Sequence, residues 1–547
     1  MFKIKHISPM EKVFPLREPS GEGAQEIYTA LKNETVSFQI AYRWSGEKRE
    51  WGKVKINAPR EIAIHVRTAA LVPCAYPSHC QADDDYLTTE PGLYPDRLEE
   101  LNESGFPMIL GQWRSLWVDV EADETTPAGI YPIEISIGVE GHMQTVKVQV
   151  EILDAVLPKL DIPHTEWFHC DCLANYYGVE VFSEEHWRIV ENFIAAAVRR
   201  GCNMILTPIF TPPLDTAPGK ERRTVQLVDV WVTDDGYRFG YDRFERWIAI
   251  CRKCGVTYFE MSHLFSQWGA AAAPKIMGYE NGELRRIFGW ETPASGEAYA
   301  AFLQEFLASF KEELKKLGIE SQCYFHVSDE PSLEQLESYR AARAIVKESL
   351  QEFPIIDALS NYDFFEKGIV DEPVCSNDHI EEFLENPPEK LWTYYCTAQW
   401  KDVSNRFIAL PGYRTRVLGV QMYKHQISGF LHWGYNFYNC QYSLYPVNPY
   451  LVTDADGVFP AGDAFLVYPG ADGIPEESIR LMLMEEAMND LRAMRYLEKL
   501  TDRETVLECL GDEELTFKRY PRNLTYLGQV RKRVNRKISE AVSNIQG

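Results

Sequence analysis

The chain has 547 residues, of which 45% are hydrophobic and 25% are charged, a composition typical of folded globular proteins. Its formal net charge of −25 repels phosphate groups, so nucleic acid is not an expected partner, and anionic membranes and polyanionic substrates are disfavoured. No apolar run reaches the roughly eighteen residues of a membrane-spanning helix, so membrane insertion is not expected. The length allows roughly two to four domains.

The N-terminal segment and the cysteines bear on location. Residues 1–9 lack the apolar core of a signal peptide. Twelve cysteines in so long a chain do not form the dense spacing pattern of a disulfide framework. We therefore expect reduced thiols and a cytoplasmic protein.

Residues 1–155 alternate apolar and polar side chains, the pattern of strands with one buried face. A Glu-Gly-His segment at 140–142 joins two such runs and predicts a hairpin. One short charged helix is expected near 96–102. The pattern predicts an all-β domain, a sandwich. The alternating runs lie at 36–42, 116–120, 133–139 and 146–152.

After a proline-containing linker at 156–163, strand-like segments alternate with helical ones. Helix signals include Ser183 as a start and Gly201 and Gly318 as stops. Eight repeats of strand and helix predict a (β/α)8 TIM barrel over residues 160–500. The eight strand candidates are 165–169, 203–207, 257–263, the segment before Asp329, 354–359, 373–376, 391–396 and 429–435.

Residues 501–547 are predicted to be helical. Val530, Val534, Ile538 and Ala541 recur at helical spacing and give one apolar stripe. We expect a short C-terminal appendage that docks on the barrel.

Asp329 and Glu330 are adjacent acids at the end of the fourth predicted barrel strand. The apolar Tyr-Phe-His-Val stretch at 324–327 precedes them, and Ser332 with Gln335 forms a capping-box pattern for the next helix. The acids therefore lie at the carboxyl end of a strand, where barrel enzymes carry their catalytic residues. The alternative is a pair of solvated loop acids near a helix start.

Two carboxylates in a barrel mouth are typical of glycoside hydrolysis. The usual mechanisms place them on opposite sides of the scissile bond, about 5 Å or more apart. Neighbouring residues in a regular strand instead point to opposite faces, with Cα atoms about 3.8 Å apart. Adjacent acids fit a substrate-assisted mechanism better, in which one protonates the leaving oxygen and the other orients the substrate's 2-acetamido group.

Further site candidates follow other predicted strands. His169 and Asp171 end the first strand and are predicted to bind sugar hydroxyls, the alternative being a local structural pair. His326, on the fourth strand, is expected to be a hydrogen-bonded core histidine. Aromatic side chains near the last strands predict a stacking platform for a sugar ring. The remaining predicted substrate-binding residues are Asn361, Tyr395, Trp433, Tyr435 and Asn436.

No metal or cofactor is expected. Cys170 and Cys172 could be combined with Cys251 and Cys254 into a four-thiolate zinc site. The second pair, however, falls within a predicted helix, and the first is poorly spaced for the other half. No phosphate-binding glycine loop, dinucleotide fingerprint, metalloprotease motif or nucleophile elbow occurs.

Three segments in this order resemble glycoside hydrolase family 123 and its wider group, domain of unknown function 4091. They are the Asp-Glu-Pro at 329–331, the Gly-Phe-Leu-His-Trp-Gly-Tyr at 429–435, and the stretch 462–480 with its Tyr-Pro-Gly. The resemblance covers roughly residues 160–500. The N-terminal domain, with its Thr-Pro-Ala-Gly-Ile-Tyr turn at 126–131, also looks like the domain that precedes these barrels.

The resemblance implies a retaining exo-glycosidase that releases terminal β-linked N-acetylgalactosamine from a glycan or glycoconjugate, with Glu330 as general acid and Asp329 as the orienting anion. Two alternatives stay open. One is a conventional retaining glycosidase acting on another sugar, with a nucleophile such as Asp171 or Asp357. The other is a non-catalytic carbohydrate-binding protein. The exact hexosamine, the aglycone and the oligomeric state remain open.

Overall fold

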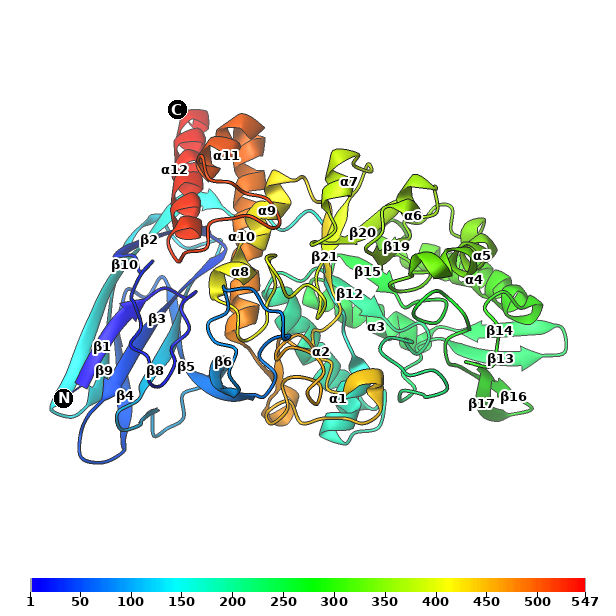
Figure 1. Ribbon diagram of the computed structural model, residues 1–547, viewed down its shortest axis with the longest axis horizontal. Helices are drawn as coiled ribbons and strands as arrows, with labels where there is room; N and C mark the ends of the chain where they lie inside the picture. Colours follow the sequence, from blue (N-terminus) through cyan, green and yellow to red (C-terminus); the bar gives the residue numbers. More distant parts are fainter. Residues whose placement is uncertain (1, 547) are drawn as a thin grey trace.

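The computed structural model describes residues 2–546, so the outermost residues of the predicted segments 1–155 and 501–547 lie outside it. Ten N-terminal strands form two five-stranded sheets, in the orders β1-β3-β8-β5-β6 and β2-β10-β9-β4-β7 (Figure 1). The strands are β1 Phe2–Ile7, β2 Ile27–Lys32, β3 Glu34–Trp44, β4 Glu50–Asn57, β5 Ala63–Cys74, β6 Gly92–Glu100, β7 Phe106–Met108, β8 Trp113–Ala122, β9 Gly129–Val139 and β10 His142–Val156.

The two N-terminal sheets share one core. Inward side chains of β3 and β8 from one sheet and of β9 and β10 from the other form a single buried cluster. The predicted hairpin at 140–142 is confirmed, since Val139 pairs with His142. The predicted helix near 96–102 is wrong: most of this segment is the end of β6, which pairs with β5.

Eight parallel strands form a second, nearly closed sheet in the order β18-β15-β12-β11-β22-β21-β20-β19. A parallel bridge between Phe325 and Ile355 joins its two edge strands and closes the ring. The acid pair follows the fourth of these strands in chain order, as predicted. The strands are β11 His164–Glu166, β12 Met204–Thr207, β15 Tyr258–Met261, β18 Cys323–Tyr324, β19 Ile356–Leu359, β20 Glu372–Ser376, β21 Trp392–Tyr394 and β22 Gly429–His432.

A helix follows each barrel strand along the chain. Ser183 caps α2, and Gly318 ends α4 in the left-handed conformation, both as predicted. The helices are α1 Cys170–Tyr177, α2 Glu184–Arg199, α3 Asp242–Cys254, α4 Glu297–Leu317, α5 Leu336–Lys347, α6 Asp363–Glu366, α7 Glu381–Glu385, α8 Gly412–Arg416, α9 Leu418–Lys424 and α10 Ile479–Leu500, with single 3-10 turns at Glu320–Gln322, Leu333–Gln335, Gln441–Ser443 and Ala471–Gly473.

Two hairpins that the sequence reading missed interrupt the barrel repeats. Together they form a four-stranded sheet at the side far from the N-terminal sheets (Figure 1). They were missed because strand–turn–strand segments between barrel elements read as loops. The strands are β13 Asp229–Thr233, β14 Gly236–Gly240, β16 Ile276–Glu280 and β17 Glu283–Phe288; a two-stranded ribbon is formed by β23 Tyr468–Pro469 and β24 Pro475–Glu476.

The C-terminal segment contains α11 Arg503–Leu510 and α12 Tyr526–Gln546. Helix α12 contacts α10 and also β2 and β10, so it docks on the N-terminal sheets as well as beside the barrel (Figure 1). Arg531 forms an ion pair of 2.7 Å with Glu34, and the Asn535 amide donates to the Thr29 carbonyl at 3.0 Å. Within residues 2–546, no helix is long and apolar enough to span a membrane.

Buried ion pairs join the N-terminal sheets to the barrel. Arg67, on β5, pairs with Asp119 at 2.6 Å and with Glu477 at 2.5 Å, just before α10. Arg480, on α10, pairs with Asp96 of β6 at 2.8 Å. All five side chains are buried.

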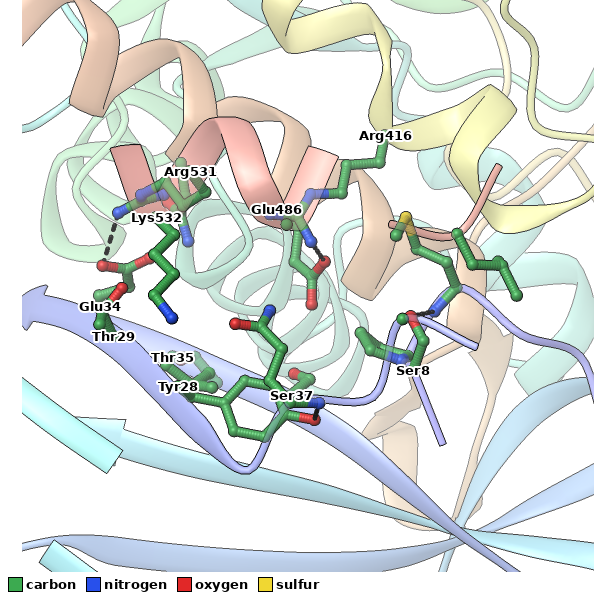
Figure 2. A pocket seen from close by; sticks show the side chains of 18 residues that line it. Ser8, Tyr28, Thr29, Glu34, Thr35, Ser37, Arg416, Glu486, Arg531 and Lys532 are labelled. Carbon is green, nitrogen blue, oxygen red and sulfur yellow. Dashed lines mark hydrogen bonds and ion pairs between the residues drawn. The ribbon is translucent and has the colours of Figure 1, made fainter. Parts of the chain in front are cut away.

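A cavity of about 60 Å³ lies within this junction, between the first strands, α10 and α12 (Figure 2). Figure 2 shows the ion pairs Arg531–Glu34 and Arg416–Glu486 facing it. Such a volume holds only a few water molecules. The cavity is therefore part of the domain junction and too small for a sugar.

Candidate active site

A larger cavity, of about 310 Å³, opens near the carboxyl ends of the barrel strands. This is close to the lower end of the roughly 300–1,000 Å³ that small-molecule sites occupy. Its position is the one that barrel enzymes use for catalysis. The lining residues are Trp167, Leu214, Asp215, Gln267, Trp268, Asp329, Glu330, Ala358, Tyr394, Cys396, Thr397, Leu431, Trp433, Gln441, Tyr442 and Phe459.

Asp329 and Glu330 both line this cavity, although they are neighbours in the chain. Strand β18 ends at Tyr324, and Glu330 has a φ of +43°, in the left-handed region that non-glycine residues rarely adopt. The regular alternation that would send neighbouring side chains to opposite faces is therefore interrupted. Backbone bonds hold this conformation: the Asp329 carbonyl accepts from Trp268 N–H at 3.0 Å, and Glu330 N–H donates to the Ala358 carbonyl at 3.1 Å.

Gln267 fixes one oxygen of Asp329. Its Oε1 accepts a hydrogen bond from the backbone N–H of Asp215 at 2.6 Å, and its Nε2 lies 2.7 Å from Asp329 Oδ2. Since a backbone N–H can only donate, the amide orientation is set by Asp215, and Nε2 must donate to Asp329. Asp329 Oδ2 is thus an acceptor, and Oδ1 is left for another partner.

Tyr394 holds Glu330 in a matching way. Its hydroxyl donates to Glu330 Oε1 at 2.7 Å. The Cys396 thiol lies 3.9 Å from the same oxygen. Glu330 lines the cavity, and its Oε2 has no hydrogen-bond partner among residues 2–546, so it is available for a second partner.

Burial raises the pKa of both carboxyls, and the negative charge of Glu330 raises that of Asp329 further. Glu330 keeps exposed surface at the cavity, but its carboxyl group is packed closely enough for desolvation to dominate. Two carboxyls that share a site hold one proton between them over a pH range in which separate carboxyls would both be ionised. The pair can therefore supply one acid and one anion together.

The cavity is acidic as a whole. Among the described residues that line it, Asp215, Asp329 and Glu330 are carboxylic acids, and no lysine, arginine or histidine is present. An anionic sugar would have no cationic partner there and would meet three carboxyls. The lining therefore favours a neutral sugar.

A buried network lies beneath this cavity, inside the barrel. His326 is hydrogen-bonded as predicted, with Nδ1 3.0 Å from Asp357 Oδ1 and Nε2 2.6 Å from Glu260 Oε1. These carboxylates raise the pKa of His326 to about 9, despite its burial. The Trp167 indole, part of the cavity lining, donates to Glu260 at 2.7 Å.

His263, His326 and Asp357 lie close enough together to be compared with a metal site. Both nitrogens of His326 already face carboxylates, however, and the His263 ring stacks on the His326 ring at 4.1 Å. Two stacked imidazoles do not direct their in-plane lone pairs to one point. The cluster fits an internal ion-pair network better than a metal centre.

The structure places predicted ligands His169 and Asp171 behind the cavity lining. Asp171 forms a two-pronged ion pair with buried Arg222, at 2.6 and 2.8 Å. His169 Nδ1 lies 3.2 Å from Arg222 Nη2, and His169 Nε2 donates to the Trp433 carbonyl at 2.8 Å. Both side chains are buried and support the loops around the cavity, the structural alternative of the sequence reading.

Of the remaining predicted binding residues, Trp433 alone is among the cavity-lining residues. Its indole N–H donates to Asp463 at 2.9 Å. Asn436 exchanges two hydrogen bonds with the backbone of His169, and Asn361 accepts from the backbone of Asp363. These two amides hold loops rather than face the cavity.

Tyr395 and Tyr435 point away from the cavity into the helix layer. Tyr395 is fully buried, with its hydroxyl 3.2 Å from the Met484 sulfur of α10, while its neighbour Tyr394 faces inward. One step along a strand exchanges the two faces, so Tyr394 and not the predicted Tyr395 reaches the cavity. The Tyr435 hydroxyl donates to the Phe193 carbonyl of α2, because β22 ends at His432 and the alternation does not continue.

Several lining residues were missed by the sequence reading, chiefly Asp215, Gln267, Trp268 and Tyr442. Each lies in a loop after a barrel strand. Polar and aromatic residues just beyond strands two, three and eight were the available signal. Those loops are long, and sequence alone does not show which of their residues turn inward.

Comparisons with known proteins agree with this geometry. The family model described as "Glycoside hydrolase 123, catalytic domain" matches residues 167–497. A solved structure of a family 123 glycoside hydrolase from Clostridium perfringens, reported for glycolipid glycan hydrolysis, superposes with a TM-score of 0.76 at 14% identity and covers 100% of this chain and 99% of that one. A search of curated proteins gives no match.

Other solved structures overlap only weakly. A Parabacteroides merdae β-glucuronidase has a TM-score of 0.30 at 9% identity, covering 90% of this chain and 54% of that one. The low TM-score gives it no weight. The family match spans the barrel and the acid pair, and the chain is a glycosidase that belongs to glycoside hydrolase family 123.

Proposed function

We propose that this enzyme is a retaining exo-glycosidase that releases terminal β-linked N-acetylgalactosamine by substrate-assisted catalysis. The observation that carries the proposal is the pair of adjacent carboxyls, Asp329 and Glu330, on the wall of one cavity. Their adjacency suits a mechanism in which the two carboxyls act at neighbouring positions of one sugar, Glu330 at the leaving oxygen on C1 and Asp329 at the acetamide on C2.

In the first step, the acetamide N–H donates to Asp329, which favours its anion and leaves the shared proton on Glu330. Glu330 then acts as general acid and gives this proton from Oε2 to the glycosidic oxygen. The bond from C1 to this oxygen breaks, and the carbonyl oxygen of the substrate's acetamide bonds to C1. Asp329 Oδ1 accepts a hydrogen bond from the acetamide N–H and stabilises the positive charge of the cyclic intermediate. Gln267 holds the other oxygen of Asp329.

In the second step, water attacks C1 and gives a proton to the Glu330 carboxylate. The bond between C1 and the acetamide oxygen breaks, which regenerates the acetamide and the acid. Each step inverts C1, so the configuration is retained overall.

The acidic lining supports a neutral sugar, and Trp433 and Trp167 offer aromatic faces for its ring. The Clostridium perfringens relative is described with glycolipid glycans, and we propose a glycoconjugate of this kind as substrate. The choice of a sugar with the galacto configuration rests on the family resemblance.

The test compares aryl β-N-acetylgalactosaminide and β-N-acetylglucosaminide hydrolysis by wild type, Glu330→Gln and Asp329→Asn. We expect the galactosaminide to be preferred and each variant to lose about 10²–10⁴-fold in kcat on the phenyl glycoside, whose leaving group needs a proton. A thiazoline analogue of the cyclised acetamide should inhibit. Equal rates for all three enzymes would reject the assignment of the pair.

A conventional retaining mechanism needs a separate nucleophile. Asp171 pairs with Arg222, and Asp357 is buried against His326; neither is among the lining residues. This favours the substrate-assisted route. Trapping of the enzyme by a 2-fluoro sugar would instead support the conventional one.

We further propose the architecture of a β-sandwich (1–155), a (β/α)8 catalytic barrel (160–500) and a helical appendage (501–547). The core shared by the two sheets and the helix after each barrel strand support it. Limited proteolysis should cut first near 156–163 if the linker is the domain boundary.

A reducing, cytoplasmic location is proposed from the thiols. All twelve cysteines are free and most are buried. Alkylation of the denatured protein without reductant should label twelve thiols, and a smaller number would contradict the proposal.

A further inference from the structure

Asp215 is a third carboxylic acid in the cavity, and neither the sequence reading nor the two-acid mechanism uses it. It follows Leu214 in the loop after β12 and is only partly buried. Its side chain makes one hydrogen bond to a described residue, with Oδ2 accepting from the backbone N–H of Tyr442 at 2.9 Å. Among residues 2–546, Oδ1 has no hydrogen-bond partner.

The backbone at Asp215 is held in an unfavourable conformation. Its φ is +42°, in the left-handed region. Such a conformation costs about 1–3 kcal/mol and persists where the surroundings fix it, most often at functional sites. Here the preceding carbonyl, that of Leu214, accepts from Arg222 at 3.1 Å, and the N–H of Asp215 donates to Gln267 at 2.6 Å.

Arg222 is held in turn from behind the cavity. Asp171 pairs with it in two-pronged fashion, and His169 lies beside it. The loop is thus held from the start of α1, which follows β11, and this places Asp215 on the cavity wall.

The loops beside Asp215 carry aromatic side chains. The rings of Trp268 and Tyr442 meet edge to face, with centroids 5.9 Å apart, and both residues line the cavity. Asp215 bonds the backbone of Tyr442, while Gln267 joins Asp215 to Asp329. Asp215 therefore lies between the aromatic rim and the acid pair.

We propose that Asp215 is a substrate-binding and specificity-determining residue, whose Oδ1 accepts a hydrogen bond from a hydroxyl of the sugar held by Asp329 and Glu330. The inference rests on the proposed function of that cavity. A carboxylate accepts from hydroxyls but repels anionic sugars, so the residue selects a neutral, hydroxyl-bearing ring. Desolvation raises the pKa of Asp215 to about 6, and the Tyr442 N–H and Arg222 oppose this shift.

The experiment compares wild type and Asp215→Asn on aryl glycosides of the accepted sugar and on its 3-, 4- and 6-deoxy analogues. The loss of a charge-assisted hydrogen bond should lower kcat/KM of Asp215→Asn about 10- to 100-fold on the parent sugar. With wild type, removing one particular hydroxyl should lower kcat/KM by a similar factor relative to the parent sugar. With Asp215→Asn, removing the same hydroxyl should lower kcat/KM less than about threefold. Asp234→Asn, at the exposed tip of the β13–β14 hairpin, is the matched control and should match wild type.

The ratio of kcat/KM between a deoxy analogue and the parent sugar is taken within one enzyme, so partial misfolding of the variant does not affect that ratio. A variant that loses the same factor on every analogue would make Asp215 a loop-positioning residue and overturn the proposal, as would a variant with unchanged kcat/KM. If wild type prefers a glycoside without an acetamide, the proposed function fails. The deoxy series is then made on that glycoside, and the same ratio still tests Asp215.

Discussion

The hydroxyl of Tyr394 donates to Oε1 of Glu330 over 2.7 Å, so the general acid of the proposed mechanism is tied to a residue three barrel strands further along the ring. This contact orients the carboxyl and favours its ionised form, which lowers the pKa of Glu330 against the larger effect of burial.

Replacing Tyr394 with phenylalanine should therefore raise the pKa of Glu330. We expect the basic limb of the kcat/KM profile to move to higher pH, because the protonated acid persists longer, and kcat/KM at its optimum to fall about tenfold. A pH–rate profile of both enzymes measures this. Tyr279→Phe, on hairpin strand β16, is the control. A basic limb that stays in place in Tyr394→Phe would contradict the role given to this hydrogen bond.

Glu330→Gln should show a strong dependence on the leaving group. Without a general acid, alkyl and sugar leaving groups should depart about 10²–10⁴-fold more slowly, while dinitrophenolate, which needs no proton, should be nearly unaffected in the first step. Rates over a series of aryl glycosides give the slope. Glu334→Gln, an exposed residue on the same loop, should behave as wild type. Equal losses on all leaving groups would assign Glu330 another role.

His326 should make stability depend on pH in the alkaline range. Its folded pKa of about 9 exceeds the ordinary 6.5, so its contribution is complete below pH 6.5 and is lost as pH rises through 9. The free energy of unfolding falls by about 3 kcal/mol when this contribution is lost. Unfolding free energies of wild type and His326→Gln between pH 6 and 10 should therefore converge.

Burial raises the pKa values of Asp463, Glu485 and Glu486 to about 7, so these groups also titrate in this pH range. The test therefore uses the difference in unfolding free energy between wild type and His326→Gln, in which their contributions cancel. A gap that stays constant from pH 6 to 10 would mean that His326 is neutral throughout.

Arg67→Met should destabilise the protein by about 3–5 kcal/mol, because Asp119 and Glu477 would lose a buried cationic partner. The arginines around Glu477 hold its pKa far below the ordinary 4.5, so its contribution is present above that pH and is lost as pH falls through the folded value. Chemical denaturation at pH 7 and pH 3 measures both effects. Arg536→Met removes an exposed pair and should cost less than about 0.5 kcal/mol; an equal cost for both variants would contradict the argument.

The sequence predicts the barrel well because its signals are local. The Ser183 side chain begins one helix by capping it, and Gly318 ends another in the left-handed conformation. The alternation of apolar and polar residues marks the strands. Strands β12, β19 and β20 end where predicted, but β11, β15, β18, β21 and β22 end earlier, where the chain leaves the sheet to form the cavity. Apolar residues continue past that point, so the pattern alone does not show where the strand ends.

The sequence locates the acid pair, but it does not show which residues contact the two carboxyls. Gln267 is 62 residues from Asp329, and Tyr394 is 64 residues from Glu330. Such contacts depend on how eight loops meet, which no local pattern encodes. Tyr395 illustrates the limit, since its choice over Tyr394 required the strand phase to be known to one residue.

The ion pair between Glu34 and Arg531 joins positions 497 residues apart. During synthesis, the first sheets emerge from the ribosome long before α12 exists. Their surface beneath this helix stays uncovered until residues 526–546 have been translated. A nascent chain arrested before residue 526 should consequently need chaperone protection that the released protein does not.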